Sequence, residues 1–199
     1  MTRVGLTGGI ASGKSTVARM LVSKGAHLLD ADQVARKIVE PGEPAWAEIV
    51  SWLGGSVLRD DRTLNRAQIA SLVFSNSRAL RKLNSITHPH IKKYFTLKSK
   101  EIALNFPRAI QIWDVPLLFE IGMDRDVDIV LVVVADEERQ IIRLGERDGL
   151  SRDEAKRRIA SQMDLQKKAR SADYIISNDG SLDYLQDQVD RLWIKLTKG

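Results

Sequence analysis

One glycine-rich stretch near the start of the chain, GGIASGKST, limits the possible folds more than any other feature. It carries the spacing Gly-x-x-x-x-Gly-Lys-Ser, which runs from Gly8 to Ser15. A short apolar run precedes it and apolar residues at helical spacing follow it, so the pattern predicts a strand, a loop and a helix in that order. In this context the spacing is the Walker A pattern, in which backbone N–H groups surround phosphate oxygens at the positive end of a helix dipole. The sequence therefore predicts a site for the phosphates of a nucleotide.

The side chains of this loop predict how it holds the nucleotide. We expect Lys14 to reach the β and γ phosphates and the hydroxyl of Ser15 to bind a magnesium ion. The hydroxyls of Ser12 and Thr16 could contact phosphate or could only cap the helix. The residues of the loop that are predicted to bind ATP are Gly9, Ala11, Ser12, Gly13, Lys14, Ser15 and Thr16.

A second magnesium ligand is expected at the end of a hydrophobic strand, as in other sites of phosphoryl transfer. Asp114 directly follows the apolar run IQIW and fits this position. It could instead be a solvated residue before the Val-Pro turn, but a Walker A loop needs such a carboxylate. We therefore predict Ser15 and Asp114 as the metal ligands.

Further apolar runs predict the rest of a sheet. Residues 26–29, 109–113 and 129–135 are almost continuously apolar, which is typical of parallel strands that are buried on both faces. A shorter run at residues 174–177 precedes an amphipathic helix. Strands that alternate with helices predict an α/β fold, a doubly wound parallel sheet that forms a P-loop NTPase core.

Two long segments interrupt this core. Residues 33–108 have helical patterns and are too long for a simple crossover, so they predict an inserted helical lobe that receives a substrate. Residues 137–165 predict an Arg-rich helical lid, in which SRDE at 151–154 has the form of a capping box. The nucleotide-binding core then consists of residues 1–32, 109–136 and 166–199.

Composition excludes several classes of protein. The 199 residues include no cysteine, which excludes disulfides, a cysteine nucleophile and a thiolate metal site. Only three histidines are present, which leaves little material for a histidine-based metal site. No apolar run reaches the length of about 20 residues that a membrane helix needs, so we expect a soluble cytoplasmic protein with no membrane partner. The net charge of +5 favours an anionic partner, either a polyphosphate small molecule or a nucleic acid.

Other features narrow the class of nucleotide-binding protein. No asparagine is followed by lysine, so the guanine-reading pattern Asn-Lys-x-Asp is absent. A lobe and a lid around a small core favour a kinase, because phosphoryl transfer to a small acceptor must exclude water. Arg143 and Arg147 are four residues apart on one predicted helix face, so both could meet the transferring phosphoryl group. Arg158 and Gln162 form a weaker pair with the same spacing.

The acceptor side is marked by Asp30 and Asp32, directly after the second predicted strand. The carboxyl ends of parallel strands lie at the edge of the sheet where the phosphate loop also opens. A carboxylate at this edge could accept a hydrogen bond from an attacking hydroxyl, and either Asp could instead cap the next helix. We predict the acceptor role for Asp32 and leave both roles open for Asp30.

Seven pieces of the sequence, taken in order, match the pattern of one kinase family. They are LTGGIASGKST at 6–16, DAD at 30–32, LNRAQIASLVF at 64–74, LNSITHPHI at 83–91, DVPLLFE at 114–120, RLGERDGLS at 143–151 and SNDGSL at 177–182. With these pieces the chain resembles the dephospho-coenzyme A kinase family over nearly its whole length. One departure is Ala11, where the family usually has glycine, and we expect a backbone φ there that an L-residue tolerates.

The resemblance implies a reaction and a set of residues. It implies that the γ-phosphoryl group of ATP moves to the ribose 3'-hydroxyl of dephospho-CoA, the last step of coenzyme A biosynthesis, with Asp32 facing that hydroxyl. The lobe would receive dephospho-CoA, and Asn178 would lie near the adenine of ATP. Lys14, Arg143 and Arg147 complete the predicted catalytic set.

Three residues are expected at the acceptor with less defined roles. Leu117 is expected to shape the pocket wall. Arg66 could meet a substrate phosphate or pair with an acid such as Asp61. His88 precedes a proline at a predicted helix start, so it could contact substrate or only brace the lobe.

Two other functions remain as alternatives. A nucleoside monophosphate kinase of the adenylate kinase type would use the same core, lobe and lid, but its acceptor is already an anionic phosphate and needs no carboxylate such as Asp32. A nucleic-acid-binding ATPase would use the basic lid to follow phosphates, but the sequence contains no recognisable nucleic-acid module, so we expect no nucleic-acid partner. The sequence does not determine the oligomeric state.

Overall fold

The structure is a computed structural model that describes residues 1–74 and 76–198. The chain divides into two compact units. The sheet unit comprises Met1–Asp30 and Ser99–Gly199, and the helical unit comprises Ala31–Lys98. Among the described residues, every helix is too short or too polar to span a lipid bilayer.

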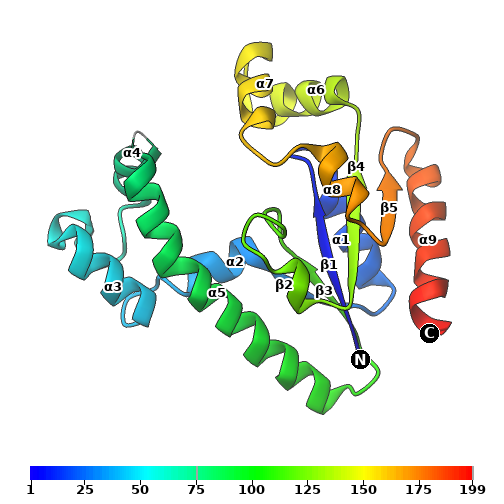
Figure 1. Ribbon diagram of the computed structural model, residues 1–199, viewed down its shortest axis with the longest axis horizontal. Helices are drawn as coiled ribbons and strands as arrows, with labels where there is room; N and C mark the ends of the chain where they lie inside the picture. The colour runs from blue at the N-terminus through cyan, green and yellow to red at the C-terminus, as the bar shows by residue number, and fades with distance from the viewer. Residues whose placement is uncertain (75, 199) are drawn as a thin grey trace. The chain divides into compact units, whose positions relative to one another are not determined.

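Within the described part of the chain, five parallel strands form one sheet in the order β2-β3-β1-β4-β5 (Figure 1). They are β1 (Thr2–Gly8), β2 (His27–Asp30), β3 (Ile110–Asp114), β4 (Ile129–Val134) and β5 (Tyr174–Ser177). The connections that leave β1 and β3 run in opposite directions, so the switch point of the topology lies at the carboxyl ends of these neighbouring strands. The predicted doubly wound α/β fold is confirmed.

One face of the sheet packs against two helices. Buried residues of α1 (Lys14–Ser23) and α9 (Leu182–Lys198) share a hydrophobic cluster with alternate residues of β1, β3 and β4. Leu6, Leu21 and Val189 in this cluster are 0% exposed. The alternation follows from the pleat of the strands, which points successive side chains to opposite faces. The remaining helices that lie wholly in this unit are α6 (Glu137–Asp148), α7 (Arg152–Ala160), α8 (Leu165–Arg170) and the 3-10 helix Asp124–Asp126.

The other face of β1 and β3 is covered by the loop after β3 and by the end of α5 (Ser77–Asn105). Gln111 is buried on this face, and its Nε2 donates to the carbonyl oxygen of Ser99 at 3.0 Å. A Cβ added to Gly5 would lie only 2.9 Å from Cδ2 of Leu118. Glycine at position 5 therefore lets the loop that follows Asp114 pack directly against β1.

The helical unit contains α2 (Ala31–Lys37), α3 (Pro44–Leu53), the 3-10 helix Gly55–Val57, α4 (Arg66–Phe74) and most of α5. Its extended pairing within the described residues is an isolated bridge between Leu58 and Leu64, which agrees with the predicted lack of strands. The unit ends at Lys98, so residues 99–108 of the predicted lobe group with the sheet. Which part of the chain acts as the acceptor lobe stays a prediction.

The proline of the LNSITHPHI stretch lies inside a helix. Pro89 falls within α5, so the prediction of a helix start at His88 was wrong. Proline removes one helical hydrogen bond and costs about 3 kcal/mol in a helix interior. Ile86, Ile91 and Phe95 are all less than 10% exposed on the two sides of Pro89. Their burial keeps the helix continuous, because tertiary packing outweighs the local preference of the proline.

Candidate active site

The phosphate loop connects β1 to α1, and its glycines are required by close neighbours. A Cβ at Gly8 would lie 2.5 Å from the backbone oxygen of Val133 on β4. Gly13 has φ 91° at the N-cap of α1, and a Cβ there would lie 1.9 Å from Nδ2 of Asn178. The loop therefore fits into a narrow space between β4 and the residue that follows β5.

Ala11 occupies a backbone conformation that favours glycine. Its φ is 56°, in the left-handed region. The expectation of a φ that an L-residue tolerates easily was wrong, because the Cβ of alanine costs roughly 1–2 kcal/mol in this region. The methyl group does find a packing partner, because Ala11 and Ile10 contact the small hydrophobic cluster formed by α6 and α7.

Two side chains brace the loop from outside. Arg143 of α6 donates from one terminal nitrogen to the carbonyl oxygen of Ala11 at 3.2 Å, and from the other to the carbonyl oxygen of Asn178 at 3.0 Å. Nδ2 of Asn178 donates to the carbonyl oxygen of Ser12 at 2.8 Å. The carbonyl oxygens of Ala11 and Asn178 are neutral acceptors, so they hold the half-buried Arg143 guanidinium beside the loop without forming an ion pair.

Lys14 and Asp114 form an ion pair at the switch point between β1 and β3. Asp114 is 5% exposed, so its charge needs a cation close by. Asp30, the last residue of β2, is the register partner of Asp114, the last residue of β3, so two aspartates lie side by side at this edge of the sheet.

The donor set at the loop fits a magnesium ion. Among the described residues, no group of three or more His, Cys, Asp or Glu side chains could hold a metal by itself. Ser15 is exposed in the first turn of α1 and offers a hydroxyl, and Asp114 offers a carboxylate. Magnesium keeps several waters and takes phosphate oxygens, so two protein ligands suit it.

The lid arginines divide into two groups. Arg147 pairs with the neighbouring Asp148, Nε to Oδ1, at 2.8 Å, and its side chain is 59% exposed. Arg158 of α7 pairs with Oδ2 of the same carboxylate at 3.2 Å. The hydrogen bond from Arg147 lowers the pKa of Asp148 below its usual value. The same hydrogen bond raises the pKa of Arg147. The structure therefore places Arg143 on the phosphate loop but does not bring Arg147 there, although both are on α6.

The predicted capping box of the lid is confirmed. Ser151 accepts from the backbone of Glu154, and the Glu154 carboxylate accepts from the backbone of Ser151 at 2.9 Å. Gln162, predicted as a weaker partner of Arg158, has a buried Oε1 for which no hydrogen-bond partner is found.

The predicted acceptor residues lie in both units. Asp32 is in the first turn of α2, in the helical unit. Arg66 donates to the carbonyl oxygen of Arg36 at 3.2 Å, whereas Asp61 accepts from the hydroxyl of Thr63. The structure thus gives Arg66 a different contact from the predicted pairing with Asp61.

The other two acceptor residues differ in exposure. His88 is half-buried, and burial together with the charge of Lys92 lowers its pKa, so the ring is neutral at neutral pH. Leu117 is 40% exposed in the loop after β3 of the sheet unit.

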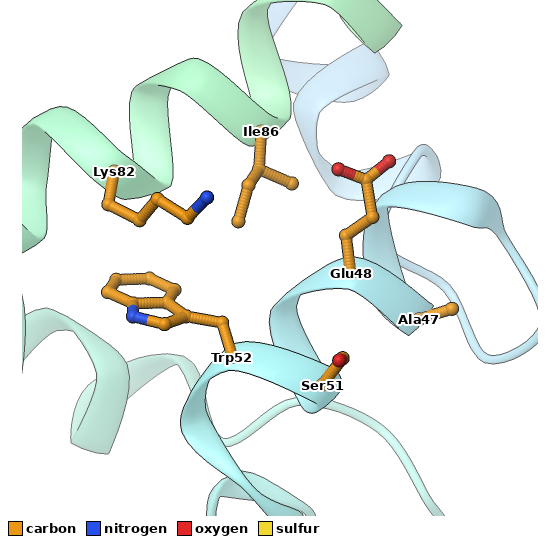
Figure 2. A pocket seen from close by; sticks show the side chains of 6 residues that line it. All are labelled: Ala47, Glu48, Ser51, Trp52, Lys82 and Ile86. Carbon is orange, nitrogen blue, oxygen red and sulfur yellow. The ribbon is translucent and has the colours of Figure 1, made fainter.

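The helical unit contains a pocket of about 570 Å³ (Figure 2). Four of its lining residues come from α3 and two from α5: Ala47, Glu48, Ser51, Trp52, Lys82 and Ile86. Figure 2 shows the indole of Trp52 and the ammonium of Lys82 facing the same space. Oε1 of Glu48 lies within hydrogen-bond distance of Nε2 of His90, at 2.8 Å, so the carboxylate has a polar partner in the same unit.

Sequence reasoning missed one buried charged residue. Lys168 of α8 is 0% exposed and pairs with Glu120 at 2.9 Å. It belongs to the run QKKAR, in which no sequence pattern indicates that the first lysine is exposed and the second is buried.

Several known proteins with similar sequences are named dephospho-CoA kinase. A dephospho-CoA kinase from Syntrophus aciditrophicus is 45% identical over 198 residues, which cover 100% of this chain and 84% of the relative. One from Carboxydothermus hydrogenoformans is 45% identical over 94% of this chain and 90% of its own. The solved structure of a dephospho-CoA kinase from Campylobacter jejuni superposes with a TM-score of 0.75 at 29% identity, covering 99% of this chain and 98% of that one.

A more distant structure shows how far the fold alone extends. Shikimate kinase from Bacteroides thetaiotaomicron covers 98% of each chain with a TM-score of 0.54 at 15% identity. The parallel sheet, the phosphate loop after β1 and the buried carboxylate at the end of β3 define a P-loop nucleotide-binding core. A family model described as dephospho-CoA kinase matches residues 2–184. The chain belongs to the dephospho-CoA kinase family.

Proposed function

We propose that this protein transfers the γ-phosphoryl group of ATP to the ribose 3'-hydroxyl of dephospho-CoA, giving CoA and ADP. The observation that carries the proposal is the Arg143 guanidinium, bound to the carbonyl oxygens of Ala11 in the phosphate loop and of Asn178 after β5, in a chain of this family. A cation held in this way remains available for an anionic group that enters the loop. Phosphoryl transfer depends mainly on positioning and on such charge stabilisation.

The sheet unit would hold ATP. Lys14 would exchange its carboxylate partner Asp114 for the β and γ phosphates, and Asp114 with Ser15 would then serve a magnesium ion. When bound, that ion would neutralise part of the charge on the phosphate oxygens. Arg143 would contact the transferring group, whereas Arg147 would have to leave Asp148 before it could do so.

Asp32 would accept a hydrogen bond from the attacking 3'-hydroxyl. The transition state of phosphoryl transfer is loose, so this carboxylate orients the hydroxyl more than it removes its proton. The alternative acceptor, a nucleoside monophosphate, has an anionic phosphate that a carboxylate at this position would repel.

The pocket of the helical unit would receive part of the acceptor away from the reacting hydroxyl. Trp52 offers an apolar face and Lys82 a cation, which suit a molecule with a flat base, phosphates and a neutral arm. Residues 33–108 would thus act as the acceptor lobe and residues 137–165 as the lid. A cytoplasmic location stays a prediction from the sequence.

The first experiment compares acceptors. Purified protein is incubated with Mg-ATP and either dephospho-CoA, its 3'-deoxy analogue or AMP, and the products are identified by mass. We expect dephospho-CoA to gain one phosphate and the other two to remain unchanged. Conversion of AMP to ADP, with dephospho-CoA untouched, would assign the chain to nucleoside monophosphate kinases instead.

A second experiment tests the acceptor carboxylate. Asp32→Asn should reduce kcat on the order of 10²–10³-fold, because it removes the charge that orients the hydroxyl. Asp60→Asn, an exposed carboxylate of the same unit, is the matched control and should keep its activity. Nearly full activity of Asp32→Asn would remove that residue from the proposed site.

A further inference from the structure

Lys168 is fully buried in the sheet unit, and its ammonium has two partners. Nζ donates to the carbonyl oxygen of Pro116 at 3.0 Å and pairs with Oε1 of Glu120 at 2.9 Å. The lysine side chain is 0% exposed and that of Glu120 is 23% exposed. Both partners lie in the loop that follows β3, so a residue of α8, which comes much later in the sequence, holds this loop in place.

The loop is also anchored to β1. The hydroxyl of Thr7 donates to the carbonyl oxygen of Pro116 at 2.9 Å. The backbone N–H of Val115 donates to the carbonyl oxygen of Leu6 at 2.9 Å. One carbonyl oxygen, that of Pro116, therefore receives hydrogen bonds from β1 and from Lys168. These bonds fix the chain within two residues of Asp114, the carboxylate that pairs with Lys14.

The same glutamate reaches the lid. Oε1 of Glu120 accepts from the backbone N–H of Met163 at 3.2 Å, in the connection between α7 and α8. A single carboxylate oxygen thus joins the buried lysine to the end of the lid segment.

A buried lysine is costly unless its charge is paired, and an apolar side chain of the same volume would fill the space without that cost. Burial of a charge therefore points to a need for a fixed geometry rather than for stability alone. The geometry at stake is the position of the loop that leaves Asp114.

We propose that Lys168 is a positioning residue for Asp114, the carboxylate that is proposed to bind magnesium. By holding Pro116 and Glu120 it sets the direction of the chain after Asp114, and through Glu120 it ties the end of the lid to that chain. The inference rests on the proposed role of Asp114 toward magnesium. Residues behind a metal ligand change metal affinity or activity by about 10–100-fold when they are replaced.

The test is the variant Lys168→Met, which keeps a long unbranched side chain, one atom shorter than that of lysine, and removes the charge. Binding of ATP is measured by calorimetry with magnesium and with EDTA, in the absence of any acceptor. We expect affinity for Mg-ATP to fall about 10-fold while affinity for metal-free ATP changes little. Lys167→Met, at the exposed neighbouring position, is the control and should match the parent protein in both conditions.

A purely structural role predicts a different result. It would lower the melting temperature of Lys168→Met but leave the ratio of the two affinities unchanged, and that outcome would overturn the proposal. If Lys168→Met does not fold, Glu120→Gln decides, since it keeps a hydrogen-bond acceptor and should shift the same ratio by a smaller factor. Failure of the proposed reaction would appear separately, as ATP binding without phosphorylation of dephospho-CoA.

Discussion

Two regions of the sheet unit contain arginines from the same helix but treat their charge differently. At the phosphate loop, Arg143 binds main-chain carbonyl oxygens and is half-buried. One turn later, in the last turn of α6, Arg147 binds a carboxylate and is mostly exposed. The residue type and the helix are the same, and the partner differs. A cation held by neutral acceptors can meet an anionic substrate without first breaking an ion pair, whereas one that is paired with a carboxylate cannot.

The contrast extends to the neighbours of each arginine. The side chain of Asn178 donates a further hydrogen bond to the loop beside Arg143, so the backbone that holds this cation is itself fixed. Arg158 adds a second cation to the Asp148 carboxylate, so the lid end of α6 is a surface ion-pair cluster. Exposed pairs of this kind contribute little to stability, because solvent screens them.

The largest effect is expected at the loop. Arg143→Met should lower kcat/KM on the order of 10²–10³-fold, because it removes a preorganised cation from the site of developing charge. The measurement is steady-state kinetics with dephospho-CoA and Mg-ATP, together with a melting curve to show that the variant is folded. A loss of less than about 5-fold would put Arg143 in the same group as Arg147.

A smaller effect is expected one turn away. Arg147→Met should lower kcat/KM by less than about 10-fold, since it breaks an exposed ion pair. Because the pKa of Asp148 is lowered, the pair is present above the ordinary pKa of the carboxyl group and is lost only as the pH falls through the lowered value. The ratio of rates between Arg143→Met and Arg147→Met should therefore be constant between about pH 6 and 8. A 10²-fold loss for Arg147→Met would mean that this arginine leaves Asp148 during the reaction.

Releasing both lid arginines should have a modest effect that depends on salt. Asp148→Asn removes the shared carboxylate of Arg147 and Arg158 and should tighten ATP binding by up to about 3-fold at low ionic strength. The gain should vanish at about 1 M salt, where the Debye length is only about 3 Å. Fluorescence titration with ATP at both salt concentrations measures it, and a gain that is independent of salt would indicate a structural change in the lid.

The smallest effect concerns the backbone of the loop itself. Ala11→Gly should raise the free energy of unfolding by up to about 1 kcal/mol, because it relieves the strain of an alanine in the left-handed region. The greater flexibility that glycine gives the unfolded chain offsets part of this gain. Gly13→Ala is the opposite control and should destabilise, since its Cβ would meet Asn178 at 1.9 Å. Urea unfolding of both variants measures the differences, and a destabilised Ala11→Gly would show that the methyl contact with the lid cluster matters more than the strain.

Local patterns predicted most of the fold. The strand runs, the glycine loop and the capping box at Ser151 are all set by residues close in sequence, and the structure has each of them. The helix start at His88 was predicted from the proline and failed, because buried residues on both sides of Pro89 hold α5 together. Packing between distant residues decided that point, and a single sequence does not display it.

The sequence by itself determined the class of the site, because a Walker A loop encodes its function in consecutive glycines, Lys14 and Ser15. Only the tertiary structure decided which cations serve that loop. Arg143 and Arg147 are equivalent by spacing, and Lys168 is one lysine of a charged run. Yet Arg143 binds Ala11, 132 residues away, Lys168 binds Pro116, 52 residues away, and Arg147 binds the next residue along the chain. Burial and pairing set the chemistry of a charged side chain, and both are properties of the folded chain.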